Sequence, residues 1–279
     1  MRTREVETAD GITLEVRDSG PGPAETVLLL HGFPQDSSAW DRVVPPLRGA
    51  GYRVLAPDQR GYSPGARPSG RRAYGLGRLV GDALGVLDDA GVDRAHVVGH
   101  DWGGGVAWAL AGRHPDRLAS VTVLSTPHPA AMRAAMRGSQ GLRSAYMLAA
   151  QVPVVPDLAL GAFGARPLRT VLEASGLPAP VARHYAARMA EPGALTGALG
   201  WYRAIPGDRT SAGRCGVPAL YVWGARDPAL GRRAAEGTEA FVTGPYRFEV
   251  LPSAGHWLPE TAADEVVPPL LEHLAAYPA

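Results

Sequence analysis

Short apolar runs alternate along the chain with stretches in which apolar side chains recur at helical spacing. Four continuous runs predict strands buried on both faces of a sheet, at 27–30, 52–56, 95–98 and 118–124. Between them, 76–90 repeats apolar residues every three or four positions, and 103–113 is a run of small residues that predicts another helix. A shorter helical stretch covers 40–50. Regular alternation of this kind predicts a mostly parallel sheet covered by helices.

The alternation has a hairpin before it and a long interruption within it. Residues 3–17 read as two short strands that turn at Asp10-Gly11. After 127 no clear strand follows until 219–223, which precedes a strand at 246–251 and a last helix near 263–276. We therefore predict one α/β core, 1–127 and 212–279, interrupted by a mostly helical cap over 128–211.

A strand, a sharp turn and a helix follow one another around Asp101. The residues Gly99-His100-Asp101-Trp102-Gly103 have the spacing of a nucleophile elbow with aspartate at its centre. Glycines on both sides make room for a strained turn, which directs the central side chain into a cleft at the carboxyl end of the sheet. The following helix N-terminus favours an anion there. The plainer alternative is that Asp101 only caps that helix.

With this elbow, the chain resembles the α/β-hydrolase superfamily. More narrowly, it resembles the aspartate-nucleophile branch, which includes soluble epoxide hydrolases and haloalkane dehalogenases. The matching motifs extend over nearly the whole chain: His31-Gly-Phe-Pro34, Asp58-Gln-Arg-Gly-Tyr-Ser-Pro-Gly65, Gly99-His-Asp-Trp-Gly-Gly104, Trp223-Gly-Ala-Arg-Asp227 and Gly255-His-Trp257. The resemblance implies an α/β-hydrolase fold with an inserted helical cap.

The family order of nucleophile, acid and histidine assigns a triad to Asp101, Asp227 and His256. An ionised aspartate attacks carbon directly and forms an alkyl ester, which water activated by His256 then hydrolyses. Asp227 would orient the imidazole and stabilise its cationic form. The resemblance further implies an oxyanion hole made by the backbone N–H groups of Phe33 and Trp102.

Two tyrosines are candidates for the acid that protonates the leaving oxygen of an epoxide. Tyr202 lies in Trp201-Tyr202-Arg203, which matches a family element, although Gly200 departs from the asparagine that relatives often carry. Tyr146 resembles the first cap tyrosine, with Gln151 five residues later. A phenol suits this role because its pKa of about 10 keeps it protonated at neutral pH. Ordinary packing is the alternative for both, and two further tyrosines, Tyr62 and Tyr185, are held in reserve.

We expect Phe33, Trp102 and His128 to line the substrate pocket. The apolar stretch 145–163 suggests a lipophilic one. The other histidines have structural interpretations, and no H-x-x-H cluster indicates a metal site. We predict no metal and no cofactor.

These features predict an epoxide hydrolase that opens a small lipophilic oxirane to a vicinal diol with water. A haloalkane-type dehalogenase is the nearest alternative, but Phe33 stands where those enzymes commonly have asparagine, and Trp102 stands where fluoroacetate dehalogenases have arginine. An ordinary esterase requires serine or cysteine at 101. A non-catalytic binder on the same fold is less favoured because every triad member is present.

The composition argues against several other classes of protein. With 28 basic and 27 acidic residues, the net charge of +1 argues against an electrostatic nucleic-acid binder. The single cysteine, Cys215, excludes an internal disulfide framework. The chain contains no lysine for a Schiff base. We read no signal peptide, and Gln151, Pro153 and Asp157 interrupt the most apolar run, so we predict a cytoplasmic protein without a membrane span, either monomer or homodimer.

Overall fold

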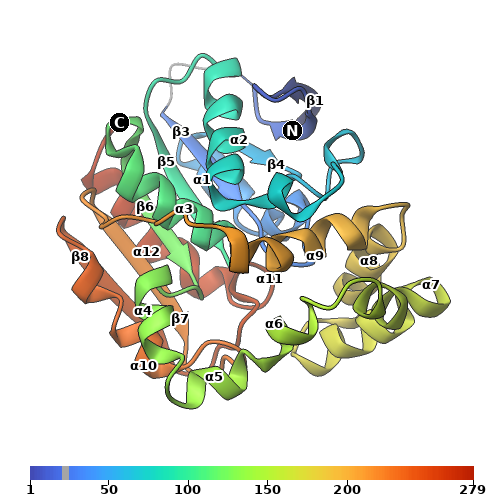
Figure 1. The fold of residues 1–279 in the computed structure, drawn as a ribbon. Helices are drawn as coiled ribbons and strands as arrows, with labels where there is room; N and C mark the ends of the chain where they lie inside the picture. The colour runs from blue at the N-terminus through green and yellow to red at the C-terminus, as the bar shows by residue number, and fades with distance from the viewer. Residues whose placement is uncertain (21–24) are drawn as a thin grey trace.

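A computed structural model describes residues 1–20 and 25–279 and contains one eight-stranded sheet (Figure 1). Its strands lie in the order β1-β2-β4-β3-β5-β6-β7-β8. The strand bounds are β1 Arg2–Glu7, β2 Thr13–Asp18, β3 Thr26–Leu30, β4 Arg53–Pro57, β5 Ala95–His100, β6 Leu118–Leu124, β7 Ala219–Gly224 and β8 Tyr246–Leu251. The β1–β2 and β2–β4 pairs are antiparallel and all others are parallel. The predicted mostly parallel sheet is confirmed.

The helices account for the chain between these strands. Their bounds are α1 Val44–Gly49, α2 Leu76–Asp89, α3 Trp102–Arg113, α4 Pro129–Ala135, α5 Ser139–Arg143, α6 Ala145–Ala149, α7 Val155–Ala174, α8 Ala179–Met189, α9 Ala194–Ala204, α10 Arg232–Glu236, α11 Leu258–Thr261 and α12 Ala263–Ala276. Helix α3 packs on β5 and β6, and α12 packs on β6 and β7. Strands β3, β5, β6 and β7 are buried throughout, as their continuous apolar runs require.

The helix expected over 40–50 is two pieces. A 3₁₀ turn, η1, covers Ser37–Trp40, and α1 begins only at Val44. The Asp36 side chain accepts a hydrogen bond from the Ser38 N–H and caps the turn. Prolines follow directly in the first turn of α1, where their missing N–H costs nothing. The apolar spacing predicted one helix because it does not register where proline restarts the hydrogen-bond pattern.

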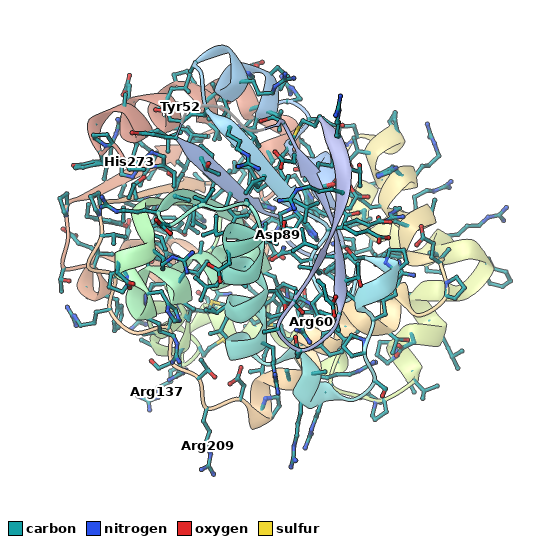
Figure 2. The ribbon with its side chains drawn as sticks, turned by 90° about the horizontal axis from the view of Figure 1, so that it is seen from above. Tyr52, Arg60, Asp89, Arg137, Arg209 and His273 are labelled. Atoms are coloured by element: carbon teal, nitrogen blue, oxygen red, sulfur yellow. The ribbon has the colours of Figure 1, made fainter. Side chains whose placement is uncertain are left out.

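The hairpin predicted at the N-terminus is present, and a buried arginine holds its turn. One Arg60 nitrogen, Nη2, lies 2.9 Å from an Asp10 oxygen in the turn and 2.6 Å from an oxygen of Asp82 on α2. Figure 2 shows Arg60 at the tip of the hairpin. Arg60 belongs to the 58–65 motif and is 1 % exposed, so its pairing with these two aspartates gives it a structural role.

The segment between β6 and β7 is helical, and within the described part of the chain it contributes no strand to the sheet. In Figure 1 these helices extend from α5 at the bottom of the molecule to α7, α8 and α9 on its right-hand side. Helix α4 packs against α10 of the core, whereas α7 packs against α8 and α9. The exact cap limits of 128 and 211 stay a prediction. The arrangement places a helical layer over the carboxyl ends of the parallel strands.

Candidate active site

Asp101 occupies a strained turn between β5 and α3. Its backbone has φ 50° and ψ −120°, a left-handed conformation that costs a non-glycine residue roughly 1–3 kcal/mol. The turn closes only because its flanks lack side chains. A Cβ added to Gly99 would lie 2.3 Å from the Gly103 carbonyl oxygen, and one added to Gly103 would lie 2.0 Å from that of Leu30. The glycines of the motif are therefore required by space.

The structure brings Asp101, Asp227 and His256 together from three separate loops. His256 Nδ1 donates to Asp227 Oδ2 at 2.8 Å, and His256 Nε2 lies 3.5 Å from Asp101 Oδ2. The second Asp227 oxygen accepts hydrogen bonds from the N–H groups of Ala229 and Leu230, at 2.8 and 2.9 Å. These bonds fix the Asp227 carboxylate, so the imidazole presents Nε2 to Asp101.

The opposite charges of His256 and of the carboxylates of Asp101 and Asp227 stabilise one another. Burial alone raises the pKa of Asp101, but His256 and the Phe33 N–H outweigh it and hold that pKa below its usual value. Burial lowers the pKa of His256, but the Asp227 and Asp101 carboxylates outweigh it and raise that pKa well above its usual value. At neutral pH an ionised aspartate thus faces an imidazolium.

Both expected oxyanion-hole residues lie beside Asp101. The Phe33 N–H donates to Asp101 Oδ1 at 2.8 Å, across 68 residues of sequence. Trp102 is the first residue of α3, so its N–H is one of those that a helix N-terminus leaves without a partner within the helix. A donor already bonded to a carboxylate oxygen is placed to hold that oxygen when it becomes an oxyanion.

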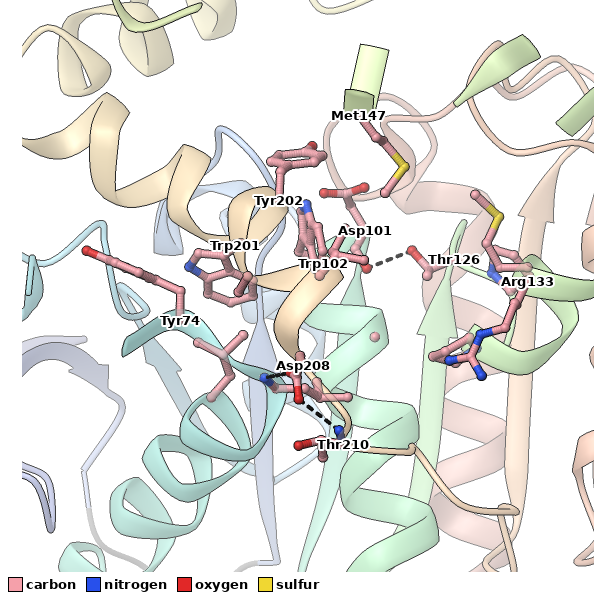
Figure 3. Close-up of a pocket in the computed structure, with 18 of the residues that line it drawn as sticks. Tyr74, Asp101, Trp102, Thr126, Arg133, Met147, Trp201, Tyr202, Asp208 and Thr210 are labelled. Atoms are coloured by element: carbon pink, nitrogen blue, oxygen red, sulfur yellow. Dashed lines mark hydrogen bonds between the residues drawn. The ribbon is translucent and has the colours of Figure 1, made fainter. Parts of the chain in front are cut away.

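A cavity of about 340 Å³ opens onto Asp101 (Figure 3). Its walls come from α2, α4, α6 and α9 and from the elbow itself, and most are apolar. Trp102, Tyr146 and Tyr202 all line it, as the sequence analysis expected of Trp102. Lining residues that the sequence did not single out include Leu76, Leu79, Met132, Met136 and Ile205, which carry no motif and meet only in the fold.

Tyr202 and Tyr146 are neighbours at the cap side of the cavity. Their ring centroids lie 6.1 Å apart, and the Tyr202 ring also packs edge-on against Trp102 at 5.0 Å. Tyr202 is 4 % exposed, whereas Tyr146 is 47 % exposed. Burial raises the pKa of the Tyr202 phenol, and the negative charge of Asp101 adds to this. The pKa of Tyr146 is raised as well, although part of its ring is exposed. Both therefore stay protonated at neutral pH.

Gln151 ties the two tyrosine-bearing segments together. Its side-chain Nε2 donates to the Tyr202 carbonyl oxygen at 2.6 Å and to the Met147 carbonyl oxygen at 3.3 Å. The sequence marked this glutamine only by its distance from Tyr146. In the structure it joins the loop after α6 to α9.

Two residues expected to line the pocket do not. His128 is 1 % exposed, its ring stacks on Phe241 with centroids 5.1 Å apart, and its Nδ1 accepts from the Ala130 N–H at the start of α4. Its neighbours Pro127 and Pro129 line the cavity instead, so the imidazole faces the core. The expectation for His128 is wrong.

Phe33 is also absent from the cavity wall. Its ring packs edge-on against Tyr202, with centroids 5.4 Å apart, and Tyr202 forms the wall there. Tyr185 and Tyr62, the two further candidates for the acid, do not line the cavity either. The Tyr185 hydroxyl donates to Glu260 at 2.9 Å, and the Tyr62 hydroxyl is buried with no hydrogen-bond partner among the described residues.

Residues 1–20 and 25–279 contain neither a metal-binding cluster nor a membrane-spanning helix. No group of three or more histidine, cysteine or acidic side chains is arranged to hold a metal ion. No helix there is long and apolar enough to cross a membrane.

Comparison with known proteins identifies the family of the chain. The model of the alpha/beta hydrolase fold family matches residues 25–263. Epoxide hydrolase A of Mycobacterium tuberculosis is 35 % identical over 315 residues, covering 98 % of this chain and 97 % of that protein. The AB hydrolase superfamily protein YfhM of Bacillus subtilis is 34 % identical, with 95 % of each chain covered.

Solved structures of epoxide hydrolases also match this chain over nearly its whole length. The crystal structure of epoxide hydrolase A from Mycobacterium thermoresistibile superposes with a TM-score of 0.86 at 32 % identity and covers 99 % of each chain. An epoxide hydrolase mutant from Bacillus megaterium, solved with its diol product, superposes with a TM-score of 0.85 at 27 % identity, covering 98 % of this chain and all of that one.

Proposed function

Because the chain belongs to the α/β-hydrolase family, and because named epoxide hydrolases match it over nearly its whole length, we propose that it hydrolyses epoxides to vicinal diols. The reaction runs through a covalent ester on Asp101. The substrate is a lipophilic epoxide, in keeping with the mostly apolar cavity, and the second substrate is water.

In the first half, a carboxylate oxygen of Asp101 attacks an oxirane carbon and the carbon–oxygen bond of the ring breaks. The elbow aims this carboxylate into the cavity, and its lowered pKa keeps it ionised. The ring oxygen leaves as an alkoxide and takes a proton from Tyr202 or Tyr146, both of which line the same cavity. The result is a hydroxyalkyl ester of Asp101.

In the second half, His256 acts as the base. Ester formation removes the negative charge that lay 3.5 Å from Nε2, and this loss makes the imidazolium more acidic. It returns its proton to the tyrosine that gave one up, and the neutral ring can then accept a proton from water. Hydroxide adds to the ester carbonyl, and the Phe33 N–H and the Trp102 N–H hold the oxyanion. The ester bond to the substrate oxygen then breaks, and this oxygen takes the proton of the added hydroxyl, so the diol departs and Asp101 is again a carboxylate.

One observation carries this assignment: two protonated phenols line the same cavity as an aspartate nucleophile. An alkoxide is a poor leaving group and needs an acid, whereas a halide leaves as an anion and needs only donors. Phe33 stands where haloalkane dehalogenases commonly have asparagine, and its ring, packed against Tyr202, carries no N–H or O–H donor for a halide. The cavity therefore favours epoxides over haloalkanes.

The test is to trap the ester. His256→Gln retains the nucleophile and loses the base, so epoxide exposure should increase the intact protein mass by the full mass of the epoxide. The double variant with Asp101→Ala should gain nothing. His128→Gln is the matched control, since that imidazole lies outside the cavity, and it should turn over without accumulating an adduct.

Two other results would contradict the proposal. An adduct formed only from haloalkanes, lighter than the halide by one hydrogen halide, would indicate a dehalogenase. Diol formation by Asp101→Ala at the wild-type rate would exclude the covalent route.

A further inference from the structure

The polar side chains of the cavity wall differ in whether they are already bonded. Thr126 Oγ1 donates to the Asp101 carbonyl oxygen at 2.7 Å. Asp208 accepts from the backbone N–H of Leu76 and from that of Thr210, the latter at 2.8 Å, and so caps the start of α2. Neither side chain is free to bind a ligand strongly.

Arg133 is the cationic side chain of this wall. It lines the cavity from α4, it is exposed, and its guanidinium has no ion pair or hydrogen bond with any residue in 1–20 or 25–279. Figure 3 shows Arg133 on the opposite side of the cavity from Tyr74 and Trp201, with Asp101 between them in that view. A ligand that reacts at Asp101 can therefore extend along an apolar wall and end at a cation.

Two more arginines follow Arg133 in the sequence. From 128 to 156 the chain carries Arg133, Arg137 and Arg143, and no aspartate or glutamate. Arg143 donates to the carbonyl oxygens of Asp227 and Pro228, both at 2.9 Å, and so stays close to the site. Arg133 is thus the positively charged side chain of a wall that also contains Asp101 and Asp208.

We propose that Arg133 binds a carboxylate on the substrate, so that the preferred substrates are epoxides with an apolar body and a carboxylate at the far end. The guanidinium fork matches the two oxygens of a carboxylate. The inference rests on the proposed function, because it concerns the substrate of the same site.

A purely structural role for Arg133 makes a different prediction. Arg133 stands in the last turn of α4, where a cation stabilises the helix C-terminus. Loss of that role would affect all substrates alike. Recognition of a carboxylate affects only substrates that carry one.

The experiment compares a terminal-epoxy fatty acid of medium chain length with its methyl ester. The measured quantity is the ratio of kcat/KM for the acid to kcat/KM for the ester. We expect the wild-type protein to favour the acid, and Arg133→Gln to lower the ratio about 3- to 10-fold, mainly through KM, as suits a partly hydrated ion pair. Raising the salt concentration should lower the wild-type ratio as well.

Two further variants distinguish loss of the Arg133 contact from loss of a positive charge anywhere in this segment. Arg137→Gln removes the same charge from the same segment, but this side chain does not line the cavity and extends away from the body of the protein (Figure 2). It should keep the wild-type ratio. Arg133→Lys keeps the charge and should retain part of the preference.

The inference is overturned if the wild-type protein shows no preference for the acid, or if Arg133→Gln changes both rates by the same factor. A protein that hydrolyses the ester but does not favour the acid still satisfies the proposed function. A protein that hydrolyses neither contradicts the proposed function itself, and the inference with it.

Discussion

Glu260 should make the protein less stable as the pH rises from about 4.5 to about 7. Its Oε1 accepts hydrogen bonds from Gln35 Nε2 at 2.6 Å and from the Tyr185 hydroxyl at 2.9 Å, while Oε2 is buried without a partner among the described residues. Burial therefore outweighs these bonds and raises the pKa of Glu260 to about 7. The test substitution is Glu260→Gln, which keeps an acceptor for both donors and cannot ionise.

The sign and size follow from proton linkage. Between its ordinary pKa of 4.5 and about 7, the folded state holds a proton that the unfolded state has released. The free energy of unfolding therefore falls as the pH rises through this window and levels off above it. At roughly 1.4 kcal/mol per pH unit the whole loss is at most about 3 kcal/mol. Glu260→Gln removes this loss.

Urea unfolding at about pH 5 and about pH 9 measures the difference between wild type and variant. We expect the two proteins to agree within about 1 kcal/mol at the lower pH and the variant to be more stable by up to about 3 kcal/mol at the higher. Glu265→Gln, at an exposed position in the following helix, is the control. It keeps Glu260, so its stability should follow that of the wild-type protein at both pH values. A variant no more stable than wild type at high pH would refute the reasoning.

Three other substitutions test separate parts of the structure. Tyr202→Phe should slow ester formation on the order of 10- to 100-fold in rapid-mixing experiments and leave ester hydrolysis much less affected, because it removes an acid and not the base. Gly103→Ala should cost more than about 3 kcal/mol and abolish soluble folded protein in expression trials, since its Cβ would lie 2.0 Å from the Leu30 oxygen. Arg188→Ala removes a cap–core ion pair with Asp58, 3.1 Å long, and should lower stability in urea by about 1 kcal/mol, less at high salt.

The sequence predicted the core well because local patterns determine it. The strand predicted at 118–124 is β6 itself, and the helix predicted at 263–276 is α12. The first is a continuous apolar run, which is typical of a buried strand, and the second buries residues at helical spacing. The predictions were less accurate where proline restarts a helix, as at α1, because spacing alone does not show hydrogen bonds.

The candidate site also has parts that could be predicted from the sequence and parts that could not. The elbow at Asp101 could be located because its glycines are local requirements, and the chain order located the two partners. The side of His128 could not be predicted, since its ring stacks on Phe241, more than a hundred residues later. The contacts of Glu260 and the uncommitted guanidinium of Arg133 likewise depend on which distant segments meet. Motifs identify reacting groups, and packing decides which other side chains surround them.

The central claim is that oxygen from Asp101 enters the product. A single turnover with enzyme in excess over epoxide, in water labelled with oxygen-18, tests it most directly, with mass spectrometry of the diol and of the peptide that contains Asp101. The covalent route predicts an unlabelled diol and label in the Asp101 carboxylate, because hydroxide attacks the ester carbonyl. A diol that carries the label in that first turnover, with an unlabelled peptide, would mean direct attack by water and would contradict the account.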